Sequence, residues 1–486
     1  MKRTLTMLLV LLMLLSSFAG CNTKKNADGA QSTTAQIEAE TDAQTEEKLD
    51  PELEAEDFGG TYSILGREAE DYSFPYFELD GNASKTDLDS KIFRRNRYIE
   101  DKYNIQLLSY YEKTGQLLTK ATTDVLAGAD HEYDTYLVPT TVAFQMATHD
   151  LLQPLEEIPH INLEKAYYDQ SLKSDTSIAN KHYFVHGHFS ISTYNAVSAL
   201  YLNKTMVSSY DLNDPYALVE SGAWTWEQMF EMCKVTTNIV EDGEANVGQH
   251  QYGISIGVYA WQPLFFSTGS SLVTKDENDM PVLQLNKCLE VIQDINRVMN
   301  DSATTFFPSS YSVSAKFNAM QIFQEGRSLF MSDPLYCVPQ YLLDCDVDYG
   351  ILPLPKYIES QQTYYSQTHA AQSTVIAVPT VMTDLNKVGK IIEDYAYQSS
   401  ITVHPVIMDT MIRLRNAQTE KDYAMLDIIF ASVRCDMGLA MSKEMKIDGD
   451  VRDLIKKNST AIASTLQSKL EEYQGAMDKV VTAWIT

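Results

Sequence analysis

Apolar residues recur along this chain with two different periods, and each period predicts one kind of element. From Leu88, the apolar positions 88, 92, 99 and 103 follow helical spacing, which predicts an amphipathic helix. Short apolar runs such as 105–108 and 133–138 predict buried strands. The same patterns predict further helices at 116–127, 285–299, 317–323, 384–400, 421–433 and 451–484, and strands at 179–189, 198–202, 252–257, 327–331 and 374–378. Helices that alternate with short strands are typical of α/β layers with mostly parallel sheets.

The segment 198–230 shows where individual elements begin and end. Pro215 suits the first position of a short helix because its φ angle is fixed, and Gly222 supplies a left-handed cap. Thr225 and Gln228 stand three residues apart, which is the spacing of a capping box at the start of a longer helix. We interpret this segment as framework.

The first twenty residues have the pattern of a secretory signal peptide. Met1–Arg3 is positively charged, 7–15 is an unbroken apolar run, and small residues precede Cys21. The run has about half of the ~20 residues that a membrane-spanning helix needs. The residues Phe18-Ala19-Gly20-Cys21 resemble the lipobox of bacterial lipoproteins, which implies a signal peptide at 1–20 and lipidation of Cys21. Two or more acyl chains on that cysteine would anchor the protein stably to a membrane.

Composition adds domain limits and excludes one class of partner. Residues 21–57 contain few large apolar side chains, so we expect a disordered acidic tether. The roughly 430 residues that follow exceed what one core usually holds, which predicts at least two lobes.

The net charge of −28 is spread along the chain, and this argues against nucleic acid because little would neutralise its phosphates. The five cysteines after Cys21 contain no C-x-x-C pair, which favours isolated buried thiols.

Several motifs, taken in order, resemble one protein family. They are RRNRYIEDKYNI at 94–105, EYDTYLV at 132–138, LYLNK with DPYALVESGAWTWEQM at 200–229, DYGILPLPK at 348–356 and MLDIIF at 425–430. Their succession resembles that of bacterial extracellular solute-binding proteins, the family that includes the maltose-type sugar-binding lipoproteins. The resemblance implies an α/β, two-lobed periplasmic-binding-protein-like fold of type II. In this fold each lobe is a mostly parallel sheet flanked by helices, and several segments cross between the lobes.

The resemblance also implies domain boundaries and a function. Lobe 1 is expected at 58–190, lobe 2 at 191–347, the hinge return with the second part of lobe 1 at 348–400, and the second part of lobe 2 with C-terminal helices at 401–486. A protein of this family binds a carbohydrate between its lobes and delivers it to the permease of an ABC importer. We therefore expect an exported monomer, lipid-anchored to the outer face of the cytoplasmic membrane, without a cofactor.

Aromatic residues near strand ends are the candidates for ligand binding. A sugar site combines aromatic platforms with polar hydrogen-bond partners, and in open α/β sheets the crevice lies beyond the carboxyl ends of the strands. This rule selects Tyr136, Tyr259, Trp261, Tyr336 and Tyr365 as platforms, and Asp134, His188, Asn195 and Asp333 as polar partners. Trp261 is the leading candidate because it follows the strand 252–257 in a segment without helical periodicity. Tyr336 stands where sugar-binding relatives often carry a Gly-Pro-Trp-type loop.

The sequence also allows interpretations other than sugar binding. His182, His186 and His188 share one face of an extended strand, which suits metal ligation, but a turn and Gly187 interrupt the alternation, so we predict no metal. The sequence shows no nucleophile elbow, phosphate loop or H-E-x-x-H motif, so we predict a binding protein. A secreted glycan-acting enzyme, and a surface sensor or adhesion module with the same fold, are the alternatives.

Overall fold

The computed structural model describes residues 49–68, 79–81, 86–240, 249–308, 318–342, 345–409 and 419–486. The predicted signal peptide, Cys21 and the tether as far as residue 48 lie outside these ranges. Within them, no helix is both long enough and apolar enough to cross a membrane.

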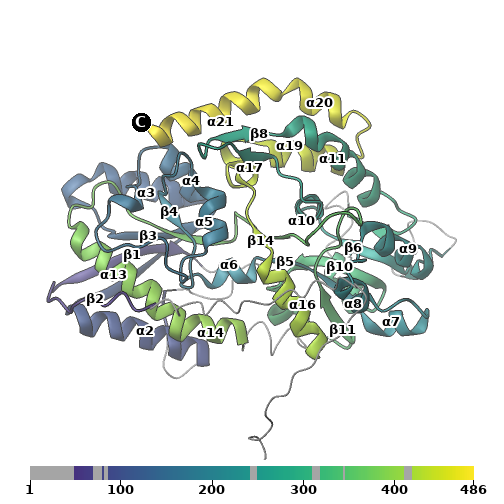
Figure 1. The fold of residues 1–486 in the computed structure, drawn as a ribbon, viewed down its shortest axis with the longest axis horizontal. Coiled ribbons are helices and arrows are strands. Elements are labelled where there is room, and N and C mark those ends of the chain that lie inside the picture. Colours follow the sequence, from purple (N-terminus) through teal and green to yellow (C-terminus); the bar gives the residue numbers. More distant parts are fainter. Residues whose placement is uncertain are drawn as a thin grey trace, which may run out of the picture. The chain divides into compact units, whose positions relative to one another are not determined.

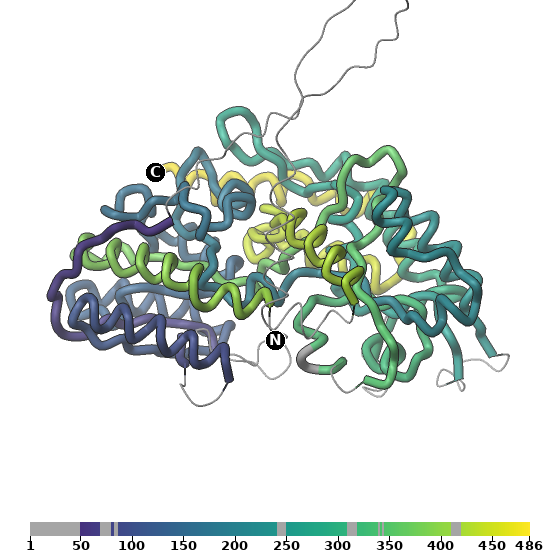
Figure 2. Tube along the Cα trace, turned by 60° about the horizontal axis from the view of Figure 1, so that its bottom comes forward, coloured from purple at the N-terminus to yellow at the C-terminus, as the bar shows by residue number. Residues whose placement is uncertain are grey.

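The first sheet defines lobe 1 and has five strands in the order β2-β1-β3-β13-β4 (Figure 1). Its strands are β1 (Thr61–Arg67), β2 (Gln106–Glu112), β3 (Thr135–Pro139), β4 (Phe184–Val185) and β13 (Thr374–Ala377). Its helices are α2 (Asp87–Tyr103), α3 (Leu117–Leu126), α4 (Thr140–Thr148), α5 (Gln170–Thr176) and α13 (Leu385–Gln398). Figure 2 shows the blue α2 and the green α13 side by side, although they come from opposite halves of the chain.

The second sheet defines lobe 2 and has five strands in the order β11-β5-β10-β6-β9. Its strands are β5 (Ser198–Asn203), β6 (Tyr252–Ile256), β9 (Thr305–Phe306), β10 (Ser328–Pro334) and β11 (Tyr349–Leu352). Its helices are α7 (Lys204–Ser209), α8 (Pro215–Glu220), α9 (Trp226–Thr236), α10 (Trp261–Ser267), α11 (Leu285–Met299), α12 (Ala319–Gln324) and α16 (Glu420–Ala431).

Two of the segments that pass from one lobe to the other lie within the described residues. The chain crosses first after α6 (Ile191–Asn195), and it returns through 353–373, which carries the short strand β12 (Ser366–Gln367). Further along, α14 (His404–Val406) packs on α2 of lobe 1, whereas α16 packs on β11 of lobe 2. The first two crossings are hydrogen-bonded to each other, since His369 N donates to Ala196 O at 3.1 Å and Thr368 Oγ1 donates to Thr193 O at 2.9 Å. These bonds fix the two segments side by side.

The C-terminal region packs on both lobes. It comprises β14 (Val433–Arg434), α17 (Met437–Ala440), α18 (Ser442–Met445), α19 (Ile447–Lys456), α20 (Ile462–Ser468) and α21 (Leu470–Ile485). Helix α20 packs on α11 of lobe 2, whereas α21 packs on α4 of lobe 1. The hairpin of β7 (Val273–Lys275) and β8 (Pro281–Leu283) reaches lobe 1 as well, where Asn180 N donates to Asp279 Oδ2 at 2.8 Å.

Most elements follow the apolar pattern, and the main differences have physical reasons. Helix α11 has the predicted bounds, Gly222 has the predicted left-handed φ of +73°, and Thr225 Oγ1 accepts from Gln228 N as predicted. The sheets are mixed, however, because each contains two parallel and two antiparallel pairings among the described strands. The antiparallel pairs involve β5 and β13, the strands that the chain enters after a crossing, and β4 and β11, which precede one.

Residues 49–57 contact lobe 1, although the composition predicts a tether there. Glu56 forms an ion pair with Lys390 at 2.8 Å, and Asn104 Nδ2 donates to Asp57 Oδ1 at 2.7 Å. The ring of Phe58 stacks on Tyr103 with centroids 5.6 Å apart. Residues 49–57 therefore pack as part of lobe 1.

Candidate functional site

Buried polar atoms without partners gather where the first two crossings meet. They include Asn195 Nδ2, His369 Nδ1 and Gln372 Oε1. Backbone bonds hold these residues close together: His369 N donates to Ala196 O at 3.1 Å, next to Asn195, and Gln372 N donates to His369 O at 2.8 Å. Tyr336 N donates to Asn195 O at 3.0 Å. More than nine in ten buried polar groups in proteins have a partner, and an unmade bond costs about 1–3 kcal/mol. Such a concentration favours a place where a polar ligand or water completes the bonding.

Tyr259 lies beside these atoms with an exposed ring. The side chain is 47% exposed, and its ring meets the His369 ring edge-on with centroids 6.1 Å apart. The guanidinium of Arg452, from α19, lies over the Tyr259 ring at 5.2 Å from its centroid. A ring that is held on one side and exposed on the other can act as a platform for an apolar sugar face. We call Tyr259, Arg452, Asn195, Tyr336, His369 and Gln372 the crossing site.

Polar side chains behind Tyr259 hold the crossing site in place. Asp448 accepts from Gln262 Nε2 at 2.5 Å and forms an ion pair with Arg452 at 3.6 Å. Gln367 Nε2 donates to Gln262 Oε1 at 3.4 Å, while Gln367 Oε1 is buried without a partner. Burial lowers the pKa of His369, so its imidazole is neutral at pH 7 and offers one donor and one acceptor. Apart from Arg452, the site therefore presents uncharged hydrogen-bonding groups, which can bond to the hydroxyls of a ligand.

Asp333 lies at the carboxyl end of β10, near Tyr336. Its side chain keeps some accessible surface, yet burial raises its pKa to about 7. Among the described residues its hydrogen-bond partner is the thiol of Cys337, which lowers the pKa by a smaller amount. The neighbouring Tyr336 hydroxyl accepts from Gln372.

Two of the predicted residues have framework roles in lobe 1. Tyr136 is fully buried, and its hydroxyl donates to Asp124 Oδ2 at 2.8 Å. Asp134 accepts from Ser63 N at 2.6 Å and so ties β3 to β1. Because these contacts already use their polar groups, we do not include Tyr136 or Asp134 in the crossing site.

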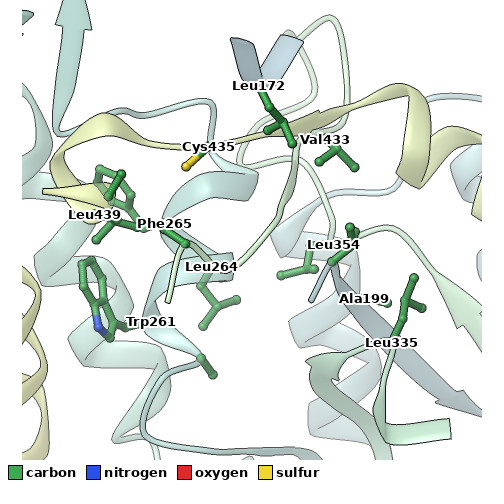
Figure 3. Close-up of a cluster of buried hydrophobic side chains, with 14 of the residues drawn as sticks. Leu172, Ala199, Trp261, Leu264, Phe265, Leu335, Leu354, Val433, Cys435 and Leu439 are labelled. Atoms are coloured by element: carbon green, nitrogen blue, oxygen red, sulfur yellow. The ribbon is translucent and has the colours of Figure 1, made fainter. Parts of the chain in front are cut away.

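Trp261 was selected because we expected it in an irregular segment after a strand. The structure corrects this expectation, because Trp261 lies in a helix. It is the first residue of α10 and is fully buried. In Figure 3 its ring lies in an apolar cluster with Phe265 and Leu439. The polar residues Gln262 and Ser267 are buried together with the apolar residues of α10, so this helix shows no amphipathic period. Tyr259, two residues earlier, has the exposure that we expected of Trp261.

The three clustered histidines point to three different partners. His182 Nδ1 bonds to Glu156, and His186 Nε2 bonds to Thr140 Oγ1 at 2.9 Å. His188 stacks on His404 with centroids 3.8 Å apart and an angle of 11°. Among the described residues, no group of three His, Cys, Asp or Glu side chains could hold a metal ion. His188 Nδ1 is buried without a partner, so a polar role for His188 stays a prediction.

The structure also shows where the Tyr365 ring packs and that the described cysteines are free thiols. The Tyr365 ring lies against Gly269, where a Cβ atom would come within 3.0 Å of it, and Gly269 has a left-handed φ of +74°. Cys233, Cys288, Cys337 and Cys435 are buried free thiols and Cys345 is a partly buried one, which confirms the prediction from their spacing.

Sequence reasoning missed Arg452, His369 and Gln372. Arg452 lies within a predicted helix, and charged helical residues usually face solvent. His369 and Gln372 lie in an irregular segment that carries no periodic signal. The motif DYGILPLPK does mark the start of that returning segment, so polar residues shortly after it were the signal available.

Solved structures similar to this chain share its fold. The cyclo/maltodextrin-binding protein complexed with maltotetraose matches with 16% identity and a TM-score of 0.54, over 87% of this chain and 96% of its own. A family 1 extracellular solute-binding protein from Bifidobacterium longum subsp. infantis matches with 14% identity and a TM-score of 0.53, over 88% and 99%. The extracellular solute-binding protein from Staphylococcus aureus in complex with maltose matches with 14% identity and a TM-score of 0.55, also over 88% and 99%.

These similarities confirm the predicted fold class. The chain has the two-lobed α/β fold of extracellular solute-binding proteins, with mixed sheets. No protein-family model matches the sequence, and no curated protein matches it.

Proposed function

We propose that this protein is the substrate-binding lipoprotein of an ABC importer, which captures a carbohydrate between its two lobes and delivers it to a membrane permease. The observation that carries the proposal is the gathering of unpartnered buried polar atoms at the segments that cross between the lobes. The fold supports it, because similar structures include proteins complexed with maltotetraose and with maltose.

The crossing site provides the two kinds of contact that a sugar uses. Tyr259 presents a ring face to the apolar side of a sugar. Asn195, His369 and Gln372 present a donor, an imidazole nitrogen and an acceptor to its hydroxyls. A ligand that bonds to both crossing segments binds the closed arrangement of the lobes more tightly than the open one, and so shifts the population toward closure.

Binding of saccharides is the direct test of this proposal. We expect titration calorimetry of the purified full-length chain with a panel of mono- and oligosaccharides to detect at least one ligand, with the bound sugar recovered unchanged. Absence of binding across the panel would contradict the proposal. Release of reducing ends from an oligosaccharide would favour the alternative of a glycan-acting enzyme.

Lipid anchoring of Cys21 is a separate part of the proposal. The lipobox resemblance and the apolar run at 7–15 support it. Replacement of Cys21 by Ser should move the protein from the membrane fraction to the soluble fraction, where it acts as an unanchored monomer. Full membrane association of the Cys21→Ser variant would show that another feature anchors the chain.

A further inference from the structure

The carboxylate of Asp448 connects the segments that carry the crossing site. It lies at the start of α19, and its Oδ1 accepts from Gln262 Nε2 of α10 at 2.5 Å. Its Oδ2 lies 3.6 Å from Nη1 of Arg452, one turn later in the same helix. Gln262 in turn accepts from Gln367 Nε2 of the returning crossing at 3.4 Å. These contacts fix the position of the carboxylate behind Tyr259.

The guanidinium of Arg452 lies beside the surface that a sugar would contact. It is 5.2 Å from the centroid of the Tyr259 ring, and the Tyr259 side chain is 47% exposed. Its ion-pair partners among the described residues are Asp448 and Asp453, with shortest distances of 3.6 and 3.8 Å. A charge-assisted hydrogen bond measures about 2.7–2.9 Å. The two carboxylates therefore balance the charge of Arg452, while its N–H groups can still bond to a ligand.

The two carboxylates differ in how strongly they balance that charge. The side chain of Asp448 is 16% exposed, whereas that of Asp453 is 58% exposed. Water and salt weaken the field of an exposed charge more than that of a partly buried one. Asp448 therefore contributes most of the negative charge that Arg452 meets at the crossing site.

We propose that Asp448 is a specificity-determining residue, which makes the crossing site bind neutral sugars and reject acidic ones. This inference rests on the proposed function, because it concerns which carbohydrate the site takes. An acidic sugar would bring its carboxylate near that of Asp448, and it would lose water without meeting an unbalanced cation. The hydroxyls of a neutral sugar can accept from the N–H groups of Arg452 while the ion pair stays intact.

The test compares sugars that differ by one charge, by titration calorimetry of the full-length chain at low ionic strength. The probe pairs are glucose with glucuronate, galactose with galacturonate, and cellobiose with cellobiouronate. In each pair a carboxylate replaces one C6 hydroxymethyl group. We expect the unaltered protein to bind the neutral member at least roughly fivefold more tightly, because like charges at a binding site repel.

The variant D448N removes the charge and keeps the shape of the side chain, with an oxygen that can accept from Gln262. We expect the affinity ratio of acidic to neutral sugar to rise at least roughly fivefold in D448N, because Arg452 then attracts the carboxylate. This gain should shrink in about 1 M salt, where the Debye length is ~3 Å. It should be absent in D448N/R452Q, which also lacks the cation.

Two further variants show whether the effect belongs to this ion pair. The matched control D453N removes the more exposed partner of Arg452 and should change the ratio less than about twofold. R452Q alone leaves Asp448 without its cation, so the ratio should fall below that of the unaltered protein. R452Q also tests the inference if D448N does not fold, which thermal unfolding of each variant checks.

The outcomes separate this inference from the proposed function. An acidic sugar that binds the unaltered protein as tightly as its neutral counterpart would overturn the inference and leave carbohydrate capture intact. So would a ratio that is unchanged in D448N and in R452Q, or one that rises equally in D448N and D453N. Absence of binding by these sugars and by the wider saccharide panel would overturn the proposed function itself.

Discussion

Tyr259 contributes to ligand affinity rather than to stability if its exposed ring is a sugar platform. We expect Tyr259→Ala to weaken saccharide binding roughly 5- to 10-fold, since an aromatic contact contributes about 1 kcal/mol. The melting temperature should change little because the side chain is 47% exposed. Tyr259→Phe keeps the ring and should bind within about twofold of the unaltered protein. Calorimetry on the three proteins checks this, and equal affinities would remove Tyr259 from the site.

Glu444 in α18 makes stability depend on pH. Its Oε2 atom is buried without a partner, and burial raises its pKa to about 7 from 4.5. The folded state then binds more protons than the unfolded state between these values, so stability falls as the pH rises through them. The full shift corresponds to about 3 kcal/mol, and partial exposure reduces it to about 1–2 kcal/mol.

We therefore expect Glu444→Gln to raise the melting temperature at pH 8 and to have little effect at pH 5. Glu471→Gln, at an exposed position of α21, serves as the control and should be neutral at both pH values. Thermal unfolding at the two pH values measures the effect. A stabilisation of equal size at pH 5 would show that the charge of Glu444 is not the cause.

Single residues were the least predictable part of the site. Tyr136 and Tyr259 both lie beside a short apolar run, and the local pattern does not distinguish them. Their roles differ because Asp124 meets the hydroxyl of Tyr136, whereas His369 and Arg452 hold one side of the Tyr259 ring. Such partners come from distant parts of the chain, so periodicity cannot reveal them.

At the scale of elements, Trp484 near the end of α21 packs this helix on lobe 1. Trp484 is fully buried against Phe144, Tyr183 and Phe184, with ring centroids 5.1, 4.9 and 5.8 Å away. Its Nε1 donates to Lys181 O at 3.2 Å.

Trp484→Ala should lower the free energy of unfolding by about 3–5 kcal/mol, the usual cost of a large buried truncation. The neighbouring Ile485 is 45% exposed, so Ile485→Ala should cost less than about 0.5 kcal/mol. Denaturant unfolding of both variants measures the two losses of unfolding free energy. Equally small losses in both variants would contradict the prediction and show that the packing of Trp484 contributes little to stability.

Elements with a clear apolar period were predictable, and short or fully buried ones were not. Leu285–Met299 alternates apolar and polar faces, so its helix α11 has the predicted bounds. Phe184–Val185 is a strand of two residues, too short for a period, and α10 is buried throughout. Pairing of β13 with β3 and β4 depends on contacts far apart in sequence, which a local pattern does not contain.

At the scale of the whole molecule, length and the order of motifs predicted two lobes. The two sheets confirm two lobes, and the chain crosses between them at 195–197 and 353–373. The contacts between these crossings place Asn195, His369 and Gln372 together, which no single motif predicted. The central claim is that a sugar bound there draws the lobes together.

Small-angle X-ray scattering of the protein with and without a saccharide, at a concentration that calorimetry shows to be saturating, tests this claim most directly. The account predicts a smaller radius of gyration with the ligand, and a smaller decrease in Tyr259→Ala at a ligand concentration too low to saturate that variant. An unchanged radius of gyration in the saturated protein would contradict capture by closure of the two lobes.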